Sequence, residues 1–276
     1  MSSITTRPLA ATVGAEVVGA THDVLLHAPD FPAWCLDALD AHGALVFREL
    51  HVDDAVQVAF SKRLGEVETF GRGEHPEIFR VTLDPAKNPV ADYLRGTFDW
   101  HIDGMTEAIP IMATLLSARA VAETGGETEF ASTYAAYSAL ASDEKARLER
   151  MRVVHSLEAA QRLVTPDPSP EELARVRMRA PKEHPLVWRH RNGRRSLVLG
   201  ATTDHIVGMD PAESRALLDD LVVRSTPPER VYRHEWTVGD LVIWDNRGVL
   251  HRALPYAEMS ARDMHRTTIK GNEPVA

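Results

Sequence analysis

Two pairs of histidine and aspartate, each two residues apart, are the first candidates for metal chemistry. They are His51 with Asp53, and His101 with Asp103. Asp53 directly precedes a helical pattern, so it is better interpreted as a helix cap. The second pair lies in the segment 98–104, FDWHIDG, which has the composition of a strand and ends at a glycine. On an extended strand, residues i and i+2 point to the same side, so one imidazole and one carboxylate could reach a single ion.

A third ligand must come from elsewhere in the chain. Two histidines and one carboxylate on one face of an octahedron leave three positions open, the arrangement that activates oxygen at non-haem iron(II). His251 is the candidate, because it follows a strand pattern and the polar turn 245–247, which we interpret as structural. Closure of a barrel or sandwich could bring this late strand beside an early one. Spacing alone leaves open that His101 and Asp103 only hydrogen-bond to each other or to the backbone.

The elements that must position these residues are many short strands with a few helices. Helical patterns cover 31–42, the stretch from Asp53 to Gly65, 132–152 and 211–226, while strand patterns cover 44–47, 77–83, 111–122, 234–253 and 265–271. A hairpin is predicted over 186–200, with Asn192-Gly193 as its turn. This alternation predicts a mainly β fold with flanking helices, built on a barrel or sandwich core.

The stretch 161–185 interrupts this pattern with prolines on both sides of a charged helix. We interpret it as an insertion and, together with residues 83–96, as a candidate lid, since long loops in compact domains are often lids. The rest of the chain, 1–276, is expected to be one domain.

Composition restricts the class of protein. Because 40 acidic residues outnumber 31 basic ones, a nucleic-acid partner is not expected. The arginine-rich tract 175–195 is interpreted as a solvated, mobile surface segment. No run of about 18 apolar residues occurs, so no membrane span is expected. The start lacks a signal-peptide pattern, and the single cysteine, Cys35, lies in a helical pattern and is expected to be buried. These features favour a cytoplasmic protein without disulfides.

Ordered motifs spread over most of the chain resemble the taurine dioxygenase (TauD/TfdA) family of iron(II)/2-oxoglutarate-dependent dioxygenases. In chain order they are GAEVVGA, WHIDGM for the family's W-H-x-D, GGETEFAS for G-G-[DE]-T, WDNRGVLHRA for W-D-N-R…H, and RDMHRTTIKG for R-x-x-H-R-x-T-x-x-G. The spacings agree as well: Thr128 lies 27 residues after His101, and Arg262 lies 11 residues after His251.

The resemblance implies a double-stranded β-helix (jelly-roll) core, with His101, Asp103 and His251 holding iron(II) at its mouth. It implies that Arg262, helped by the Thr128 hydroxyl, binds the distal carboxylate of 2-oxoglutarate, because a guanidinium matches a carboxylate and keeps its charge. Its keto-acid end would chelate the metal and O2 would take the last position, giving succinate, CO2 and a hydroxylated substrate. Arg266, four residues after Arg262, would contact an anionic substrate group or the near carboxylate of 2-oxoglutarate.

The substrate residues depart from those of the taurine-cleaving members. Aligned through Leu64-Gly65-Glu66, the chain has Phe70 and Gly73 where those members carry a histidine and a tyrosine that hold taurine, and Thr97 replaces an asparagine. These departures argue against taurine and favour a bulkier substrate, although Phe70 could equally be an ordinary core residue. The arginines at 72, 95 and 266 still allow an acidic group: a sulfonate, a sulfate ester or a carboxylate.

Two alternatives belong to other classes. A non-catalytic jelly roll that binds a metal or a small acid would need a missing ligand or a missing cosubstrate arginine. A zinc hydrolase could use the same three ligands, but Thr128 and Arg262 would then have no purpose. By analogy with the family we expect a homo-oligomer, a dimer or a tetramer, with a small-molecule substrate.

Overall fold

The strands of the protein form one large sheet and three small ones. The computed structural model describes residues 4–276, without the side chains of residues 92 and 93. The large sheet has the order β1 (Thr5–Pro8), β2 (Ala15–Val18), β3 (Ala44–Phe47), β13 (Leu241–Asp245), β5 (Ala113–Ala120), β15 (Asp263–Ile269) and β4 (Phe79–Val81). Its neighbours are antiparallel except β2 and β3. First and last strands are thus interleaved, so the sheet forms only when the two ends of the chain meet.

The three small sheets complete the β structure. Their orders are β12 (Val231–His234), β6 (Thr128–Ser132), β14 (Val249–Ala253); β11 (Thr203–Ile206), β7 (Arg152–His155), β8 (Lys182–Pro185); and β10 (Arg195–Leu197), β9 (Val187–Arg189).

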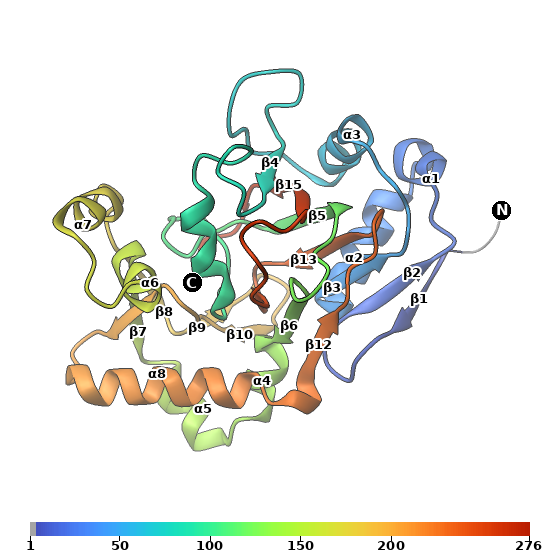
Figure 1. Cartoon of the computed structure of the whole chain (residues 1–276). Helices are drawn as coiled ribbons and strands as arrows, with labels where there is room; N and C mark the ends of the chain where they lie inside the picture. Colours follow the sequence, from blue (N-terminus) through green and yellow to red (C-terminus); the bar gives the residue numbers. More distant parts are fainter. Residues whose placement is uncertain (1–3) are drawn as a thin grey trace.

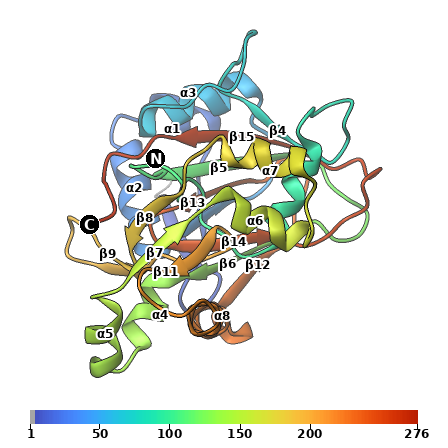
Figure 2. The same cartoon turned by 90° about the vertical axis from the view of Figure 1, so that its left-hand side faces the viewer.

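Alternating side chains of β13 show how the layers stack. Leu241 and Ile243 pack with helices α1 (His22–His27), α2 (Phe31–His42) and α3 (Asp54–Leu64), whereas Val242 and Trp244 pack with residues of β6 and β14. Both faces of the large sheet are therefore covered, by α1–α3 on one side and by the β12-β6-β14 sheet on the other (Figures 1 and 2). Because both faces are covered, β13 is apolar on both and fully buried.

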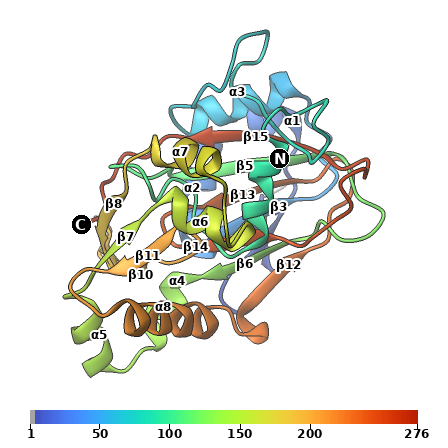
Figure 3. The same cartoon turned by 60° about the vertical axis from the view of Figure 1, so that its left-hand side comes forward.

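The remaining helices lie around the small sheets. They are α4 (Thr133–Ala139), α5 (Ser142–Leu148), α6 (Leu157–Val164), α7 (Pro170–Arg177) and α8 (Pro211–Ser225), with the 3₁₀ helices η1 (Ala91–Phe98) and η2 (Pro228–Arg230). Leu218 and Leu221 of α8 pack with Trp188 and Leu186 in a separate apolar cluster. Helix α6 packs on α7 and on η1, as Figure 3 shows. None of the helices within the described residues, 4–276, is long and apolar enough to cross a membrane.

Most local predictions are confirmed. The helix over 31–42 is α2, and α3 begins after Asp53, whose carboxylate accepts the Val56 amide, and ends before Gly65. The hairpin at Asn192-Gly193 is formed by β9 and β10, and Cys35 is buried.

Four predictions need correction. The helix over 132–152 is two helices, because Leu140 and Ala141 are extended and Arg152 already begins β7. The insertion 161–185 holds the end of α6 and all of α7 and ends in β8, so its last residues belong to a sheet. For the same reason the tract 175–195 is not simply a surface segment. Finally, the segment 98–104 is not a strand. It begins at the last residue of η1 and makes a one-residue bridge at His101.

Candidate active site

His101, Asp103 and His251 meet where this one-residue bridge forms. His101 pairs with His251 of β14 through two backbone hydrogen bonds of 3.0 and 2.9 Å. One nitrogen or oxygen of each of the three side chains lies within 4.8 Å of the others. The Asp103 carboxylate oxygens are each 3.7 Å from a histidine Nε2, one from His101 and one from His251. That separation is too long for a hydrogen bond and suits three ligands of one ion.

The backbone hydrogen bond of His101 sets which of its nitrogens is free. Its Nδ1 lies 2.9 Å from the Asp99 carbonyl oxygen, which can only accept a hydrogen bond. The ring proton is therefore on Nδ1, and the lone pair of Nε2 points at Asp103. This is the tautomer that a metal ligand needs.

The carboxylate of Asp103 is oriented by a chain of side chains from neighbouring strands. The Thr114 hydroxyl donates to it at 3.0 Å, and the Asn246 amide donates to that hydroxyl at 2.8 Å. Trp244 in turn donates its indole N–H to Asn246 at 3.1 Å. The interpretation of the turn 245–247 as structural is confirmed by these contacts and by the Arg247 guanidinium on Asp245.

Burial and neighbouring charges keep the triad ready for a cation. Burial lowers the pKa of His251 to about 3, and the nearby His101 adds to this effect, so the His251 ring is neutral. Burial by itself would raise the pKa of Asp103, but His251, Arg266, His101 and the Thr114 hydroxyl outweigh it and lower that pKa. A neutral imidazole and an ionised carboxylate are the forms that bind a divalent metal.

Arg262, the residue before β15, is a buried cation. Its side chain is 2% exposed, and burial lowers the pKa of its guanidinium, although arginine stays charged in proteins. It donates to the Gly126 carbonyl at 3.3 Å and to the Tyr256 hydroxyl at 3.4 Å. Among the side chains that the structure describes, no carboxylate forms an ion pair with it. The carboxylate of a dicarboxylic acid such as 2-oxoglutarate would supply the missing counter-charge.

A cavity of about 330 Å³ is lined by two of the three residues, His101 and Asp103. Three of the predicted substrate or cosubstrate residues, Phe70, Thr97 and Arg266, line it together with His101 and Asp103. Thr128 and Arg262 are not among its described lining residues, and neither are the arginines at 72 and 95 or Gly73. Phe70 is 39% exposed, so the alternative that it is a core residue is wrong.

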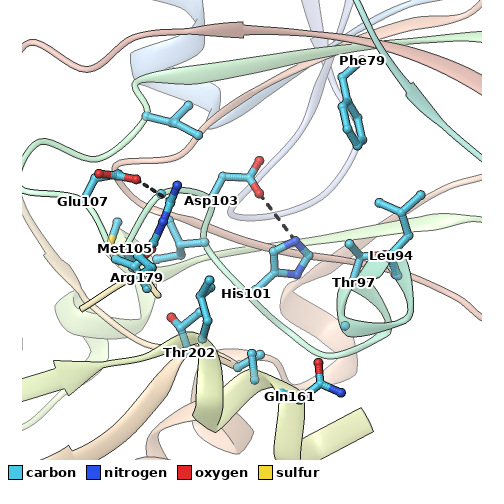
Figure 4. A pocket seen from close by; sticks show the side chains of 18 of the residues that line it. Phe79, Leu94, Thr97, His101, Asp103, Met105, Glu107, Gln161, Arg179 and Thr202 are labelled. Carbon is cyan, nitrogen blue, oxygen red and sulfur yellow. Dashed lines mark hydrogen bonds and ion pairs between the residues drawn. The ribbon is translucent and has the colours of Figure 1, made fainter. Parts of the chain in front are cut away.

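Several residues of this cavity were missed by the sequence analysis. Its apolar walls include Phe79 of β4, Leu94 of η1, and Leu157, Ala160 and Val164 of α6. Its polar walls include Glu68, Glu107 and Arg179, and Figure 4 shows Arg179 turned toward Glu107, with which it forms an ion pair. Leu94, Val164 and Arg179 lie in the two candidate lid segments, 83–96 and 161–185, but no signal singled them out, and the others reach the cavity only through long-range packing.

Phe79 holds Arg266 in place. The two residues are opposite each other on β4 and β15, and the guanidinium carbon of Arg266 lies 4.7 Å from the Phe79 ring centroid and 5.7 Å from that of Phe70. A guanidinium over aromatic faces is held by a cation–π attraction. Glu68 lies in the same cavity, and burial raises the pKa of its carboxyl group.

Comparison with known proteins places this site in a family. The family described as "Taurine catabolism dioxygenase TauD, TfdA family" matches residues 5–268. A "(S)-phenoxypropionate/alpha-ketoglutarate-dioxygenase" of Sphingobium herbicidovorans is 35% identical, over 96% of this chain and 94% of that protein. An "Alpha-ketoglutarate-dependent 2,4-dichlorophenoxyacetate dioxygenase" of a Burkholderia species is 34% identical, over 92% and 91%. The crystal structure of AAD-2 with Mn(II) and N-oxalylglycine superposes with a TM-score of 0.85 at 34% identity, covering 99% of this chain and 100% of that one.

The chain therefore belongs to the TauD/TfdA family, and it is a 2-oxoglutarate-dependent dioxygenase. This confirms the enzyme class, and with it iron(II), 2-oxoglutarate and O2, that the motifs predicted. The mainly β fold with helices is also confirmed by the match to solved structures of the family.

Proposed function

We propose that this enzyme hydroxylates a small anionic substrate with iron(II) held by His101, Asp103 and His251. The observation that carries the proposal is the convergence of these three side chains, with ligand atoms within 4.8 Å of one another, beside a cavity that His101 and Asp103 line. When bound, iron(II) and 2-oxoglutarate use O2 to place one oxygen atom in a substrate C–H bond and the other in succinate, with release of CO2. A carbon bearing sulfur, oxygen or nitrogen would afterwards lose that group.

For the cosubstrate, we propose that Arg262 and Thr128 bind the distal carboxylate of 2-oxoglutarate. Arg262 is a buried cation without a protein carboxylate partner in the described chain, and Thr128 is 4% exposed. Arg266 is closer to the triad, since its charge acts on both Asp103 and His251. We therefore assign Arg266 to the near carboxylate or to an anionic group of the substrate.

For the substrate, we propose a carboxylic acid with an aromatic or other apolar body, as in an aryloxyalkanoate. The relatives named for phenoxypropionate and dichlorophenoxyacetate support this class. So do the apolar side chains of Phe79, Leu94 and Val164, which exclude water and match an apolar ring. Phe70 and Thr97 remain the proposed substrate contacts from the sequence. A sulfonate or a sulfate ester is the second possibility, because Arg266 would accept any of these anions.

Several larger-scale assignments belong to the same proposal. The seven-stranded sheet and the β12-β6-β14 sheet would be the two faces of a double-stranded β-helix, because Phe130, Val242 and Val249 pack between them. Helices α6 and α7 would form a lid over the substrate, since residues of α6 and Arg179 line the cavity. One domain over 1–276, a homo-oligomeric state and a cytoplasmic location stay predictions from the sequence.

The non-catalytic alternative, a jelly roll that only binds a metal or a small acid, is not favoured. It would lack a ligand or the cosubstrate arginine, and the chain has both. A zinc hydrolase would leave the buried Arg262 without a purpose.

The test is succinate formation from 2-oxoglutarate under air, with iron(II) and ascorbate, across aryloxyacetates, aryloxypropionates, alkyl sulfates and sulfonates. We expect an aryloxy acid to stimulate turnover, His101→Ala to abolish it, and His51→Ala, from the other His-x-Asp pair, to retain it. Turnover that survives His101→Ala would overturn the metal assignment. Stimulation by sulfates alone would replace the substrate class and leave the rest intact.

A further inference from the structure

Thr128 makes one hydrogen bond that restricts what its hydroxyl can do. The indole N–H of Trp236 donates to Thr128 Oγ1 at 2.9 Å. An indole nitrogen can only donate, whereas a threonine hydroxyl has one proton to donate and two lone pairs that accept. Trp236 therefore occupies a lone pair of Thr128 and leaves its single proton for an acceptor.

Arg262 contacts the chain two residues before Thr128. Thr128 lies on β6, the middle strand between β12 and β14, and is 4% exposed. Two residues earlier, the Gly126 carbonyl accepts a hydrogen bond from Arg262. A Cβ on Gly126 would lie 3.0 Å from the Arg262 side chain, so the segment before β6 and the residue before β15 are in close contact here. An anion on Arg262 would thus lie near the start of β6.

Trp236 is itself fixed by a buried group. Its ring meets the His234 ring edge to face, with centroids 4.4 Å apart. His234 is fully buried between the Tyr232 hydroxyl at 3.0 Å and the Asp240 carboxylate at 3.1 Å. Burial, the larger effect, lowers the pKa of His234 although Asp240 opposes it. The indole therefore has little freedom to swing away from Thr128.

We infer that Trp236 is a positioning residue for 2-oxoglutarate: it orients the Thr128 hydroxyl so that its proton points at the distal carboxylate bound by Arg262. A donor on the hydroxyl oxygen also polarises its O–H bond, which makes that proton a stronger donor. This inference rests on the proposed role of Thr128 and Arg262, and it adds a residue that never touches the cosubstrate.

The experiment compares Trp236→Phe and Thr128→Val, singly and together, in zinc-loaded protein. Binding of 2-oxoglutarate is measured by calorimetry, and the KM for 2-oxoglutarate and kcat are measured with iron. We expect Thr128→Val to weaken binding about tenfold and Trp236→Phe about three- to tenfold, as for loss of one hydrogen bond. The double variant should be no weaker than Thr128→Val alone, because Trp236 acts only through that hydroxyl. The KM for the primary substrate should not change.

Two controls keep the test specific. Trp188→Phe removes the N–H of a buried indole that has no hydrogen-bond partner, so it should leave 2-oxoglutarate binding unchanged. Thr128→Ser keeps the hydroxyl, so Trp236→Phe should weaken binding in that background as well. If Trp236→Phe does not fold, the indole N–H resonances of ¹⁵N-labelled protein replace it. One of them should shift on adding N-oxalylglycine to wild type and Thr128→Ser, but not to Thr128→Val.

The outcomes separate the two levels of the proposal. Equal binding by wild type and Trp236→Phe, or additive losses in the double variant, would overturn the role of Trp236 while Thr128 and Arg262 stand. Unchanged binding by Thr128→Val would overturn both the inference and the proposed role of Thr128.

Discussion

The Asp103 carboxylate owes its orientation to the Thr114 hydroxyl, which donates to it at 3.0 Å. We expect Thr114→Val to lower the affinity for iron(II) about 10- to 100-fold, the usual effect of losing a hydrogen bond behind a metal ligand. Thr268→Val is the matched control, because Thr268 is opposite Thr114 on β15 and its buried hydroxyl has no hydrogen-bond partner among the described residues. The affinity of both variants for iron(II) is measured by anaerobic titration. Equal affinities would contradict the role of Thr114.

Gly200 packs closely against the backbone of His101 and so fixes its position. Its φ is +118°, and a Cβ there would lie 2.8 Å from the His101 Cα and 2.9 Å from the Trp100 carbonyl oxygen. Gly200→Ala should therefore displace His101 and weaken metal binding, besides a backbone strain of about 1–3 kcal/mol. Gly193→Ala is the comparison, since Gly193 has a φ of +85° with nothing within 4 Å of its added Cβ. It should lose stability in a thermal melt and keep full metal affinity; a parallel loss of metal would show that strain alone is responsible.

At the scale of elements, helices α6 and α7 make few contacts with the rest of the protein. Arg179 forms an ion pair with Glu107, four residues after Asp103. Arg177 and Arg162 instead pair with Glu158, within the unit formed by α6 and α7. Ser169 and Glu172 form a capping box that begins α7. The unit is therefore stabilised from within, and the Arg179–Glu107 pair is its charged connection to the cavity wall.

We expect Arg179→Gln to loosen the α6–α7 unit, the proposed lid, without unfolding the protein. The pair is exposed, so its loss should change the free energy of unfolding by less than about 1 kcal/mol. Proteolysis between α6 and α7, at 165–169, should become faster, and the KM for the primary substrate should rise. Arg175→Gln, at an exposed arginine of α7, is the control. Cleavage that is equally fast in both variants, with and without iron, 2-oxoglutarate and substrate, would argue against a lid.

For the whole molecule, buried neutral histidines predict how stability depends on pH. His155 is 0% exposed, and burial, aided by His184, lowers its pKa to about 3. Between about pH 6.5 and 3 the unfolded chain binds a proton at this residue and the folded one does not. Its contribution is therefore complete above pH 6.5 and is lost as pH falls, by about 1.4 kcal/mol per pH unit.

Denaturant titrations of His155→Asn from pH 7 to pH 4 test this. Asparagine can keep the 2.8 Å hydrogen bond to the Thr202 hydroxyl, but it does not titrate. The variant should lose stability with acid less steeply than wild type, by about one proton. Equal slopes for His155→Asn and wild type would mean that His155 takes up a proton in the folded state.

Local chemistry made much of the protein predictable from its sequence. Cap and glycine signals bounded α3, apolar spacing located α2, and Asn192-Gly193 located the hairpin, because each signal acts over a few neighbouring residues. The identities of His101, Asp103 and His251 were also readable, since few residue types bind a metal and their motifs have a recognisable order.

Only the tertiary structure decided how these residues meet and what surrounds them. The segment 98–104 was expected to be a strand, yet it is held by one bridge to β14, which lies about 150 residues later in the chain. The roles of Phe79, Arg179 and Trp236 were not predicted, because they arise from register and packing between distant elements. Such contacts depend on the free energy of the whole assembled core, which no short stretch of sequence contains.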